Sequence, residues 1–353
     1  MSRISKLRTL MQKVNVDAFL VTSPENRRYM SGFTGTSAMC LILPDKAYLL
    51  TDFRYIEQAK AQAPEFEIIK TGVKPFENVK ELVASAKRMG FEEDHMTFAE
   101  YHKLKETLQN VELSPQVKCL TDLRAIKEPE ELEKIRKAVE IADSGFDHIL
   151  KYVKVGQTEE EIAIELEFHM RKAGASGPSF DFIAASGWRS AMPHGVASSK
   201  TIEKGDLFTL DFGAIYQGYC SDITRTIVFG EPDEKQRQIY EIVLKAQQAA
   251  IEAVKPGVTG KDVDAVARDV ITEAGYGDYF GHGLGHSVGL AIHENPRCSP
   301  NDDTVIESGM VITVEPGIYL PGWGGVRIED IVVVTKNGCE VLTQAPKEFI
   351  IIE

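Results

Sequence analysis

The sequence predicts an α/β N-terminal domain followed by an α+β domain that is built from two similar halves. Three observations lead to this fold class: the length, an N-terminal third in which strand-like and helix-like stretches alternate, and an internal duplication in the remainder. The chain has 353 residues, and ordinary domains hold about 100 to 200 residues. We therefore expect two domains.

The N-terminal third contains three short apolar runs of the kind that forms strands, over residues 17–22, 38–43 and 47–51, with a turn at Pro44 and Asp45 between the last two. A charged segment with helical periodicity begins at Pro129, where the proline and the acidic residues behind it are typical of a first helical turn. The boundary falls before this helix. We assign residues 1–124 to the N-terminal domain and residues 125–353 to the second domain.

The composition excludes several classes of function. The hydrophobic content of 43% and the charged content of 26% are those of a globular protein with a normal core. The net charge of -13 opposes binding to nucleic acid, because such binding depends on Lys and Arg that displace counterions from phosphates. The N-terminus has no apolar signal segment, and no apolar run is long enough to span a membrane. The five cysteines are widely spaced without a CxxC pair, so we expect a cytoplasmic protein that does not act at a membrane.

The second domain contains a duplication that can be read directly. Residues 153–158 (VKVGQT) recur at residues 254–259 (VKPGVT), and each copy is expected to open a helix. Thr158 with Glu161, and Thr259 with Asp262, have the spacing of capping boxes. The match continues into strands, where residues 204–213 (KGDLFTLDFG) align with residues 308–317 (SGMVITVEPG). We predict two similar halves about an approximate two-fold axis.

This duplication pairs four carboxylates. Asp211 aligns with Glu315, and Asp222 aligns with Glu329. Residues 207–228 read as a hairpin that turns at Gln217 and Gly218, which places Asp211 opposite Thr224 and makes Asp211 and Asp222 diagonal neighbours on one face. An isolated aspartate in a strand usually faces solvent, but Asp211 lies in an apolar run, where an unpaired carboxylate is costly and cations are expected.

Four histidines and one arginine join the four carboxylates as candidate site residues. His282 and His286 lie among four glycines in residues 281–289 (GHGLGHSVG), a segment too rich in glycine for a stable helix. His293 lies in residues 292–296 (IHENP), and His194 lies in residues 192–195 (MPHG). In residues 324–334, alternation sends Val326 and Ile328 to one face and Arg327 and Glu329 to the other.

Four carboxylates and one imidazole form an oxygen-rich ligand set: Asp211, Asp222, His286, Glu315 and Glu329. Such a set suits two divalent metal ions, with Mn²⁺ first and Co²⁺ or Zn²⁺ as alternatives. Two divalent ions neutralise four carboxylates and acidify a shared water molecule.

These motifs resemble the pita-bread family of metallopeptidases, which includes prolidase, aminopeptidase P and methionine aminopeptidase. The resemblance rests on LDFG (Asp211), SDITRT (Asp222), GHGLGH (His286), VEPGIY (Glu315) and GGVRIED (Glu329). It implies a creatinase-like α/β N-terminal domain, an α+β pita-bread catalytic domain with an internal pseudo-two-fold duplication, and a homodimer.

The resemblance also implies roles for the other site residues. Glu315 is the proton shuttle, and His293 and His194 donate hydrogen bonds to the reacting groups. His282 and Tyr319 contact substrate, and Arg327 steadies Glu329. The implied substrates are small peptides with proline in second position, so we expect an Xaa-Pro dipeptidase.

Four alternatives remain open at this point. An aminopeptidase P would act on longer Xaa-Pro peptides, and a methionine aminopeptidase-like enzyme would prefer substrates such as Met-Ala-Ser. A creatinase-like amidinohydrolase or a non-catalytic binding protein of this fold would be expected to lack several of the five ligands, all of which are present here.

Overall fold

The computed structural model describes residues 1–353, and the chain divides into two units, Met1–Arg124 and Ala125–Glu353. We refer to them as the N-terminal unit and the C-terminal unit. No helix of the structure combines the length and the apolar character needed to cross a lipid bilayer.

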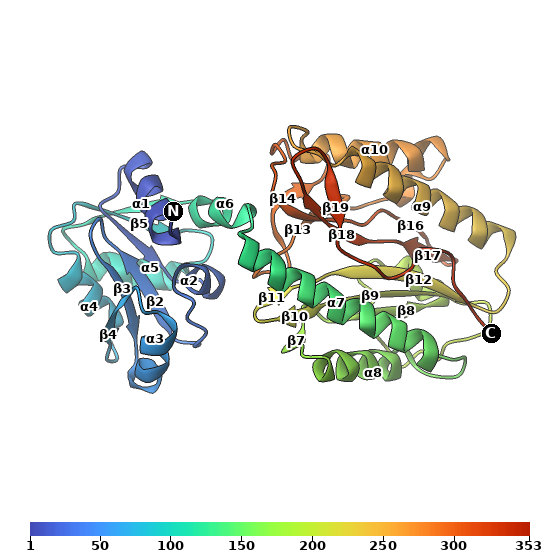
Figure 1. Cartoon of the computed structure of the whole chain (residues 1–353), viewed down its shortest axis with the longest axis horizontal. Coiled ribbons are helices and arrows are strands. Elements are labelled where there is room, and N and C mark those ends of the chain that lie inside the picture. The colour runs from blue at the N-terminus through green and yellow to red at the C-terminus, as the bar shows by residue number, and fades with distance from the viewer. The chain divides into compact units, whose positions relative to one another are not determined.

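The N-terminal unit is built on one mixed six-stranded sheet with the order β4-β3-β2-β1-β5-β6 (Figure 1). Its strands are β1 (Ala18–Val21), β2 (Ala38–Ile42), β3 (Ala47–Thr51), β4 (Glu67–Lys70), β5 (Arg88–Glu92) and β6 (Glu112–Gln116). Its helices are α1 (Arg3–Lys13), α2 (Pro24–Ser31), α3 (Ile56–Gln62), α4 (Pro75–Leu82), α5 (Phe98–Thr107) and α6 (Cys119–Ala125). The three predicted strands are β1 to β3, so the α/β prediction for this part of the chain is confirmed.

The C-terminal unit contains two helix pairs with strands between them (Figure 1). The helices are α7 (Pro129–Tyr152) with α8 (Glu159–Lys172), and α9 (Glu234–Ala253) with α10 (Gly260–Glu273). Pro129 occupies the first turn of α7, as predicted. Thr158 and Thr259 form the two predicted capping boxes, with Glu161 and Asp262 accepting the threonine N–H groups at 2.7 and 2.8 Å.

Each helix pair packs mainly on the strands of its own half. In the first half, β20-β12-β9-β8 form one sheet and β11-β10-β7 another: β7 (Gly177–Pro178), β8 (Ile183–Ser186), β9 (Leu207–Phe212), β10 (Ala214–Tyr216), β11 (Tyr219–Cys220), β12 (Ile223–Phe229) and β20 (Ile351–Ile352). In the second half, β14-β13-β15-β18-β19 and β16-β17 form the sheets: β13 (Gly285–Ser287), β14 (Glu294–Cys298), β15 (Val311–Val314), β16 (Gly317–Leu320), β17 (Gly324–Arg327), β18 (Asp330–Val334) and β19 (Cys339–Val341). Two buried clusters, one mainly in each half, fill the space between helices and strands. In a third cluster, Ile135 and Val139 of α7 pack with Val311 of β15 and with Ile331 and Val333 of β18.

The register of the predicted hairpin is confirmed, because Tyr216 pairs with Tyr219 and Asp211 pairs with Thr224. The structure adds a break at Gly213, where β9 ends and β10 joins another sheet. A side chain at Gly213 would place its Cβ 1.9 Å from the Ser221 carbonyl oxygen, so only glycine allows this close approach. Asp222 follows directly after Ser221 and lies outside the ladder, between β11 and β12.

Candidate metal centre

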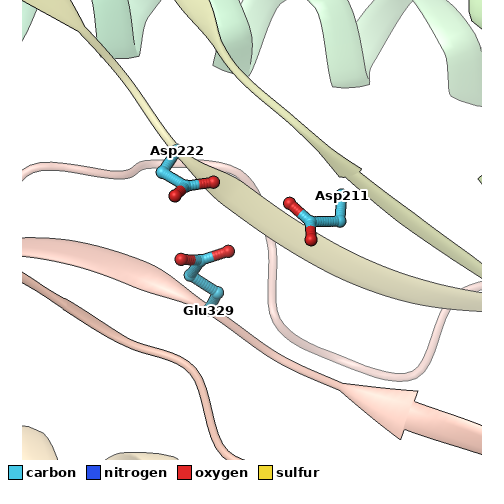
Figure 2. A group of neighbouring side chains, drawn as sticks. All are labelled: Asp211, Asp222 and Glu329. Atoms are coloured by element: carbon cyan, nitrogen blue, oxygen red, sulfur yellow. The ribbon is translucent and has the colours of Figure 1, made fainter. Parts of the chain in front are cut away.

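Three carboxylates from the two halves of the C-terminal unit point toward one another (Figure 2). Asp211 projects from β9, Asp222 from the segment before β12, and Glu329 from the segment between β17 and β18. They offer ligand atoms that all lie within 4.8 Å of one another. All three residues are buried, and Glu329 is only 1% exposed.

Glu315 and His286 join this group from the second half. His286 is on β13, and its Nε2 lies 3.5 Å from Asp222 Oδ2 and 3.4 Å from Glu315 Oε1. Glu315 follows β15 and accepts a hydrogen bond from Thr313 at 3.2 Å. The structure therefore brings together all five residues that the sequence analysis selected as ligands.

Burial and mutual repulsion disfavour the negative charge of this cluster. Burial, followed by repulsion from Glu329, Asp211 and Glu315, raises the pKa of Asp222 well above its ordinary value. Burial is also the main reason that the pKa of Glu329 is raised, and it raises the pKa of Glu315 to about 8. In a site this dry, cations are the natural means of keeping the carboxylates ionised.

Two further observations show that the donor set fits divalent ions. Asp211 Oδ1 and Glu329 Oε1 are buried and form no hydrogen bond, whereas buried carboxylate oxygens are normally satisfied. The Ser287 carbonyl can only accept, so the contact of 3.1 Å from His286 Nδ1 requires the proton to be on Nδ1. Burial also lowers the pKa of His286 to about 3, so its Nε2 lone pair faces the carboxylates unprotonated, as metal binding requires.

Arg327 links the cluster to the cavity wall. Its guanidinium donates to Asp211 Oδ2, to Thr224 Oγ1 at 3.1 Å and to Tyr319 Oη at 2.8 Å. Tyr319 Oη lies 2.8 Å from His282 Nε2. The prediction that Arg327 steadies Glu329 needs a correction: no bond between the two is present, and the direct hydrogen bond to Glu329 Oε2 comes from Thr224 at 2.7 Å. The arginine bonds directly to Asp211, and it acts on Glu329 through the shared threonine and through its charge, which opposes the rise of the Glu329 pKa that burial causes.

The protonation of His282 follows from its neighbours. Its Nδ1 lies 2.8 Å from the Gly283 carbonyl oxygen, which can only accept, so Nδ1 carries the proton. Burial and the nearby Arg327 lower the pKa of His282 to about 4, which keeps Nε2 free to accept from Tyr319.

Arg225 fixes the backbone behind the cluster. This fully buried guanidinium donates to the carbonyl oxygens of Thr224 and Glu329, and to Asp330 Oδ1 at 2.8 Å. Its other two bonds reach the carbonyl oxygens of Ala345 and Pro346, so each of its five N–H groups has an acceptor. Arg225 thus joins the strand that follows Asp222 to the strand that follows Glu329.

The cluster opens onto a cavity of about 580 Å³. Four of the five predicted ligands line it, together with His194, His282 and His293. Tyr319 does not line the cavity itself, but it bonds to His282 and Arg327, which do. His194 and His293 are exposed, and the ring centroids of His293 and His286 are 4.4 Å apart. The predicted substrate-facing histidines therefore share one cavity with the acidic cluster.

The sequence analysis did not select Arg297, Thr224 or Arg225. Arg297 is exposed, lines the cavity and lies close enough to His293 to help lower the pKa of that histidine, although burial is the larger cause. A signal for Arg297 was present, because it lies four residues after His293 in HENPR. Thr224 and Arg225 lie in the SDITRT motif itself.

Comparisons with known proteins match the whole chain. The family model described as "Metallopeptidase family M24" matches residues 133–336, and the "Creatinase/Prolidase N-terminal domain" matches residues 3–126. The chain is 45% identical over 349 residues to an Xaa-Pro dipeptidase of Pyrococcus furiosus, with 99% of each chain covered. Among solved structures, it is similar to an Xaa-Pro dipeptidase from Bacillus anthracis (TM-score 0.97, 50% identity, 99% of each chain). It is also similar to an X-Pro aminopeptidase from Thermotoga maritima (TM-score 0.92, 40% identity, 100% of each chain).

Proposed function

Because the chain belongs to metallopeptidase family M24 and carries a creatinase/prolidase N-terminal domain, we propose that it is an Xaa-Pro dipeptidase. The reaction is hydrolysis of the peptide bond between an N-terminal residue and a C-terminal proline. Membership of the family makes the chain a hydrolase with the pita-bread fold that the sequence predicted. The proposal adds the identity of the substrate, an Xaa-Pro dipeptide.

One observation carries the choice of a dipeptide. The cavity that holds the acidic cluster also presents the exposed guanidinium of Arg297, and His194 and His293 lie along the same walls. In an Xaa-Pro dipeptide, the proline carboxylate is only a few bonds from the scissile carbonyl. An arginine is well suited to bind that carboxylate, because its planar donors match the two oxygens.

We assign the metal ligands to Asp211, Asp222, His286, Glu315 and Glu329. Bound there, divalent ions supply Lewis acidity for the scissile carbonyl and activate water. The oxygen-rich donor set favours Mn²⁺, with Co²⁺ and Zn²⁺ as alternatives. The protein's contribution is the buried, prearranged position of these side chains, held by Thr224, Thr313 and Arg327.

Proton transfer is assigned to Glu315. Its side chain is 16% exposed, whereas Glu329 is 1% exposed, so Glu315 is the more accessible of the two glutamates in the ligand set. It lines the cavity and can pass a proton from the attacking water to the proline nitrogen. His293 and His194 line the same cavity, and we assign them to donate hydrogen bonds to the carbonyl oxygen as charge develops on it.

His282 and Tyr319 form the substrate wall. Arg327 donates to Tyr319, and the Tyr319 hydroxyl donates to His282, so these hydrogen bonds fix the ring of His282 in the cavity wall and the ring of Tyr319 against it. A rigid wall helps to place the small substrate in one orientation.

The decisive assay uses purified protein loaded separately with Mn²⁺, Co²⁺ or Zn²⁺. Ala-Pro, Ala-Pro-Ala and Ala-Ala-Ala are offered, and release of the first residue is measured. We expect Ala-Pro to be the best substrate and Ala-Ala-Ala to be resistant. Failure to cleave either proline peptide with any of the metals contradicts the proposal.

Arg297→Met tests the carboxylate contact. We expect KM for Ala-Pro to rise by about tenfold to one-hundredfold, since a charge-assisted hydrogen bond contributes about 1.5–3 kcal/mol. Ala-Pro amide, which lacks the carboxylate, should be affected little. Arg171→Met is the matched control, because Arg171 is an exposed arginine that pairs with Glu167 outside the cavity. Equal losses on the two substrates exclude this role.

The similarity to the Thermotoga maritima X-Pro aminopeptidase supports aminopeptidase P activity as the second candidate. It predicts that Ala-Pro-Ala is cleaved faster than Ala-Pro. The same three peptides therefore separate the two candidates.

Three further assignments complete the proposal. The creatinase-like domain comprises residues 1–124 and the catalytic domain residues 125–353. The protein is a cytoplasmic homodimer that acts on small peptides and uses neither nucleic acid nor a membrane. Light scattering of the purified protein tests the oligomeric state.

A further inference from the structure

A buried lysine near the start of the C-terminal unit contacts two residues that are next in the chain to histidines of the cavity. The side chain of Lys127 is 1% exposed. Its ammonium group donates to Ser287 Oγ at 2.8 Å and to Glu294 Oε2 at 3.3 Å, and it lies 3.4 Å from the Ala125 carbonyl oxygen. The Glu294 side chain is 6% exposed. Charged groups this far from water depend strongly on the geometry of their hydrogen bonds.

Both side-chain partners of Lys127 are next to histidines of the cavity in the chain. Ser287 follows His286, and its carbonyl oxygen accepts the bond from His286 Nδ1. Glu294 follows His293, which lines the cavity. The ammonium group thus ties together the two backbone positions from which these histidines project.

Glu294 also organises the loop of residues 288–294 from within. Its Oε1 accepts the Ala291 N–H at 3.0 Å. A Cβ at Gly289 would lie 2.6 Å from each Glu294 carboxylate oxygen, so the loop backbone wraps tightly around this carboxylate. Ile292 and His293 of the same loop line the cavity. The Glu294 carboxylate therefore contacts the backbone of the loop that carries His293.

We propose that Lys127 is a positioning residue that acts through Glu294 to hold the loop of residues 288–294, and with it His293, in the geometry needed for peptide hydrolysis. The choice of substrate for the test and the catalytic role of His293 rest on the proposed function. Without the ammonium group, the charge-assisted bonds to Ser287 and Glu294 are lost and the loop relaxes around a displaced carboxylate. A displacement of about 1 Å at a reacting group lowers the rate on the order of 100-fold.

The test compares Lys127→Met with Lys200→Met. Lys200 has the same three kinds of partner, since its ammonium group contacts Ser186 Oγ at 2.9 Å, the Thr201 carbonyl oxygen at 3.0 Å and Asp206 Oδ2 at 2.7 Å. It does not line the cavity. Two quantities are measured for each holoenzyme: kcat and KM for Ala-Pro, and hydrogen–deuterium exchange of residues 288–294.

We expect Lys127→Met to lower kcat on the order of 100-fold with a smaller change in KM and unchanged metal content. Exchange should increase within residues 288–294 and remain unchanged in α9 and α10. Lys200→Met should alter kcat by no more than about threefold and leave exchange of the loop unchanged. Lys127→Arg should recover part of the activity.

A second variant covers the case in which Lys127→Met does not fold. Lys127→Met combined with Glu294→Gln removes both charges, and its kcat should be as low as that of Glu294→Gln alone, because the two residues act as a unit. Normal kcat in the double variant overturns the proposal. So does loop exchange in Lys127→Met that matches Lys200→Met, or that increases equally throughout the C-terminal unit. If the wild-type protein does not cleave Ala-Pro, the proposed function fails, while the exchange comparison still decides the role of Lys127.

Discussion

Replacement of Arg225 by methionine should destabilise the C-terminal unit far more than the loss of any exposed arginine. Arg225 is 1% exposed and Asp330 is fully buried, and the two are 2.8 Å apart. The substitution removes the cation and the five hydrogen bonds that it donates. Lys347 and Gln247 still contact Asp330 Oδ2, so the carboxylate keeps part of its compensation.

The magnitude follows from burial. Removal of one partner of a buried ion pair costs about 3–5 kcal/mol. Arg136 provides the matched control, because it makes two bonds of 2.7 Å to Glu340 while the side chains are 40% and 50% exposed. An exposed pair of this kind contributes about 0–1 kcal/mol. Arg225→Met should thus be several times more destabilising than Arg136→Met, although both remove one arginine–carboxylate pair.

Urea unfolding monitored by tryptophan fluorescence measures the difference. Trp188 and Trp323 are the two tryptophans of the chain, and both belong to the C-terminal unit. If the free energy of unfolding falls by about 3 kcal/mol per M urea, a loss of about 3–5 kcal/mol in that free energy lowers the urea midpoint by about 1–2 M. Asp330→Asn in the Arg225→Met background should recover part of this loss, since it removes the buried charge. If Arg225→Met and Arg136→Met unfold at the same urea concentration, burial does not govern the strength of these pairs.

Three further predictions concern the acidic cluster and its surroundings. Glu315→Gln should lower kcat about 10²–10⁴-fold with little change in the urea midpoint, because the proton carrier is lost while the packing is kept; near-normal turnover removes the assigned role. Asp222→Asn should raise the urea midpoint of metal-free protein, because its ionised form is disfavoured by burial and by Glu329, and it should reduce the stabilisation by added Mn²⁺; a lower midpoint without metal contradicts this. The pKa of His282 is lowered to about 4 in the folded protein, so between about pH 6.5 and 4 the unfolded chain binds a proton that the folded chain does not, and the free energy of unfolding falls as the pH falls. His282→Gln should reduce the dependence of the free energy of unfolding on pH in this range, and an unchanged dependence refutes the assignment.

The features of the fold that depend on short-range sequence patterns or on the internal duplication could be predicted from the sequence. The capping boxes at Thr158 and Thr259 depend on residues only three positions apart. The pairing of Asp211 with Thr224 follows from the turn at Gln217 and Gly218, because a two-residue turn fixes the register of both strands. The duplication then aligned the second pair of carboxylates with the first. Short-range rules and one repeat were sufficient to select the four carboxylates, whereas His286 lies outside the repeat and was selected from its glycine-rich segment.

The contacts that hold the cluster in place could not be predicted in the same way. The reach of Arg225 to Ala345 and Pro346 spans about 120 residues of sequence, and no local pattern specifies it. The break at Gly213 depends on the close approach of Ser221, which is a tertiary contact. Arg327 was assigned to its neighbour in the chain, Glu329, but its long side chain bonds to Asp211 in the other half. Long, flexible side chains are the part of a site that sequence spacing predicts least well.

The position of Arg327 also changes the charge balance of the centre. Four carboxylates and two divalent cations would be neutral, but the buried guanidinium adds one positive charge through its bond to Asp211. This fixed cation compensates one carboxylate before any metal binds, yet Asp211 Oδ1 and Glu329 Oε1 still lack hydrogen-bond donors. In the folded protein the negative charge of the carboxylates is therefore only partly compensated. The free energy released when divalent cations bind includes relief of the remaining repulsion between the carboxylates. If two divalent cations bind at the proposed ligands, the guanidinium of Arg327 would give the ligand set an excess of positive charge, which would favour a dipeptide with a free proline carboxylate over its amide, which lacks that negative charge.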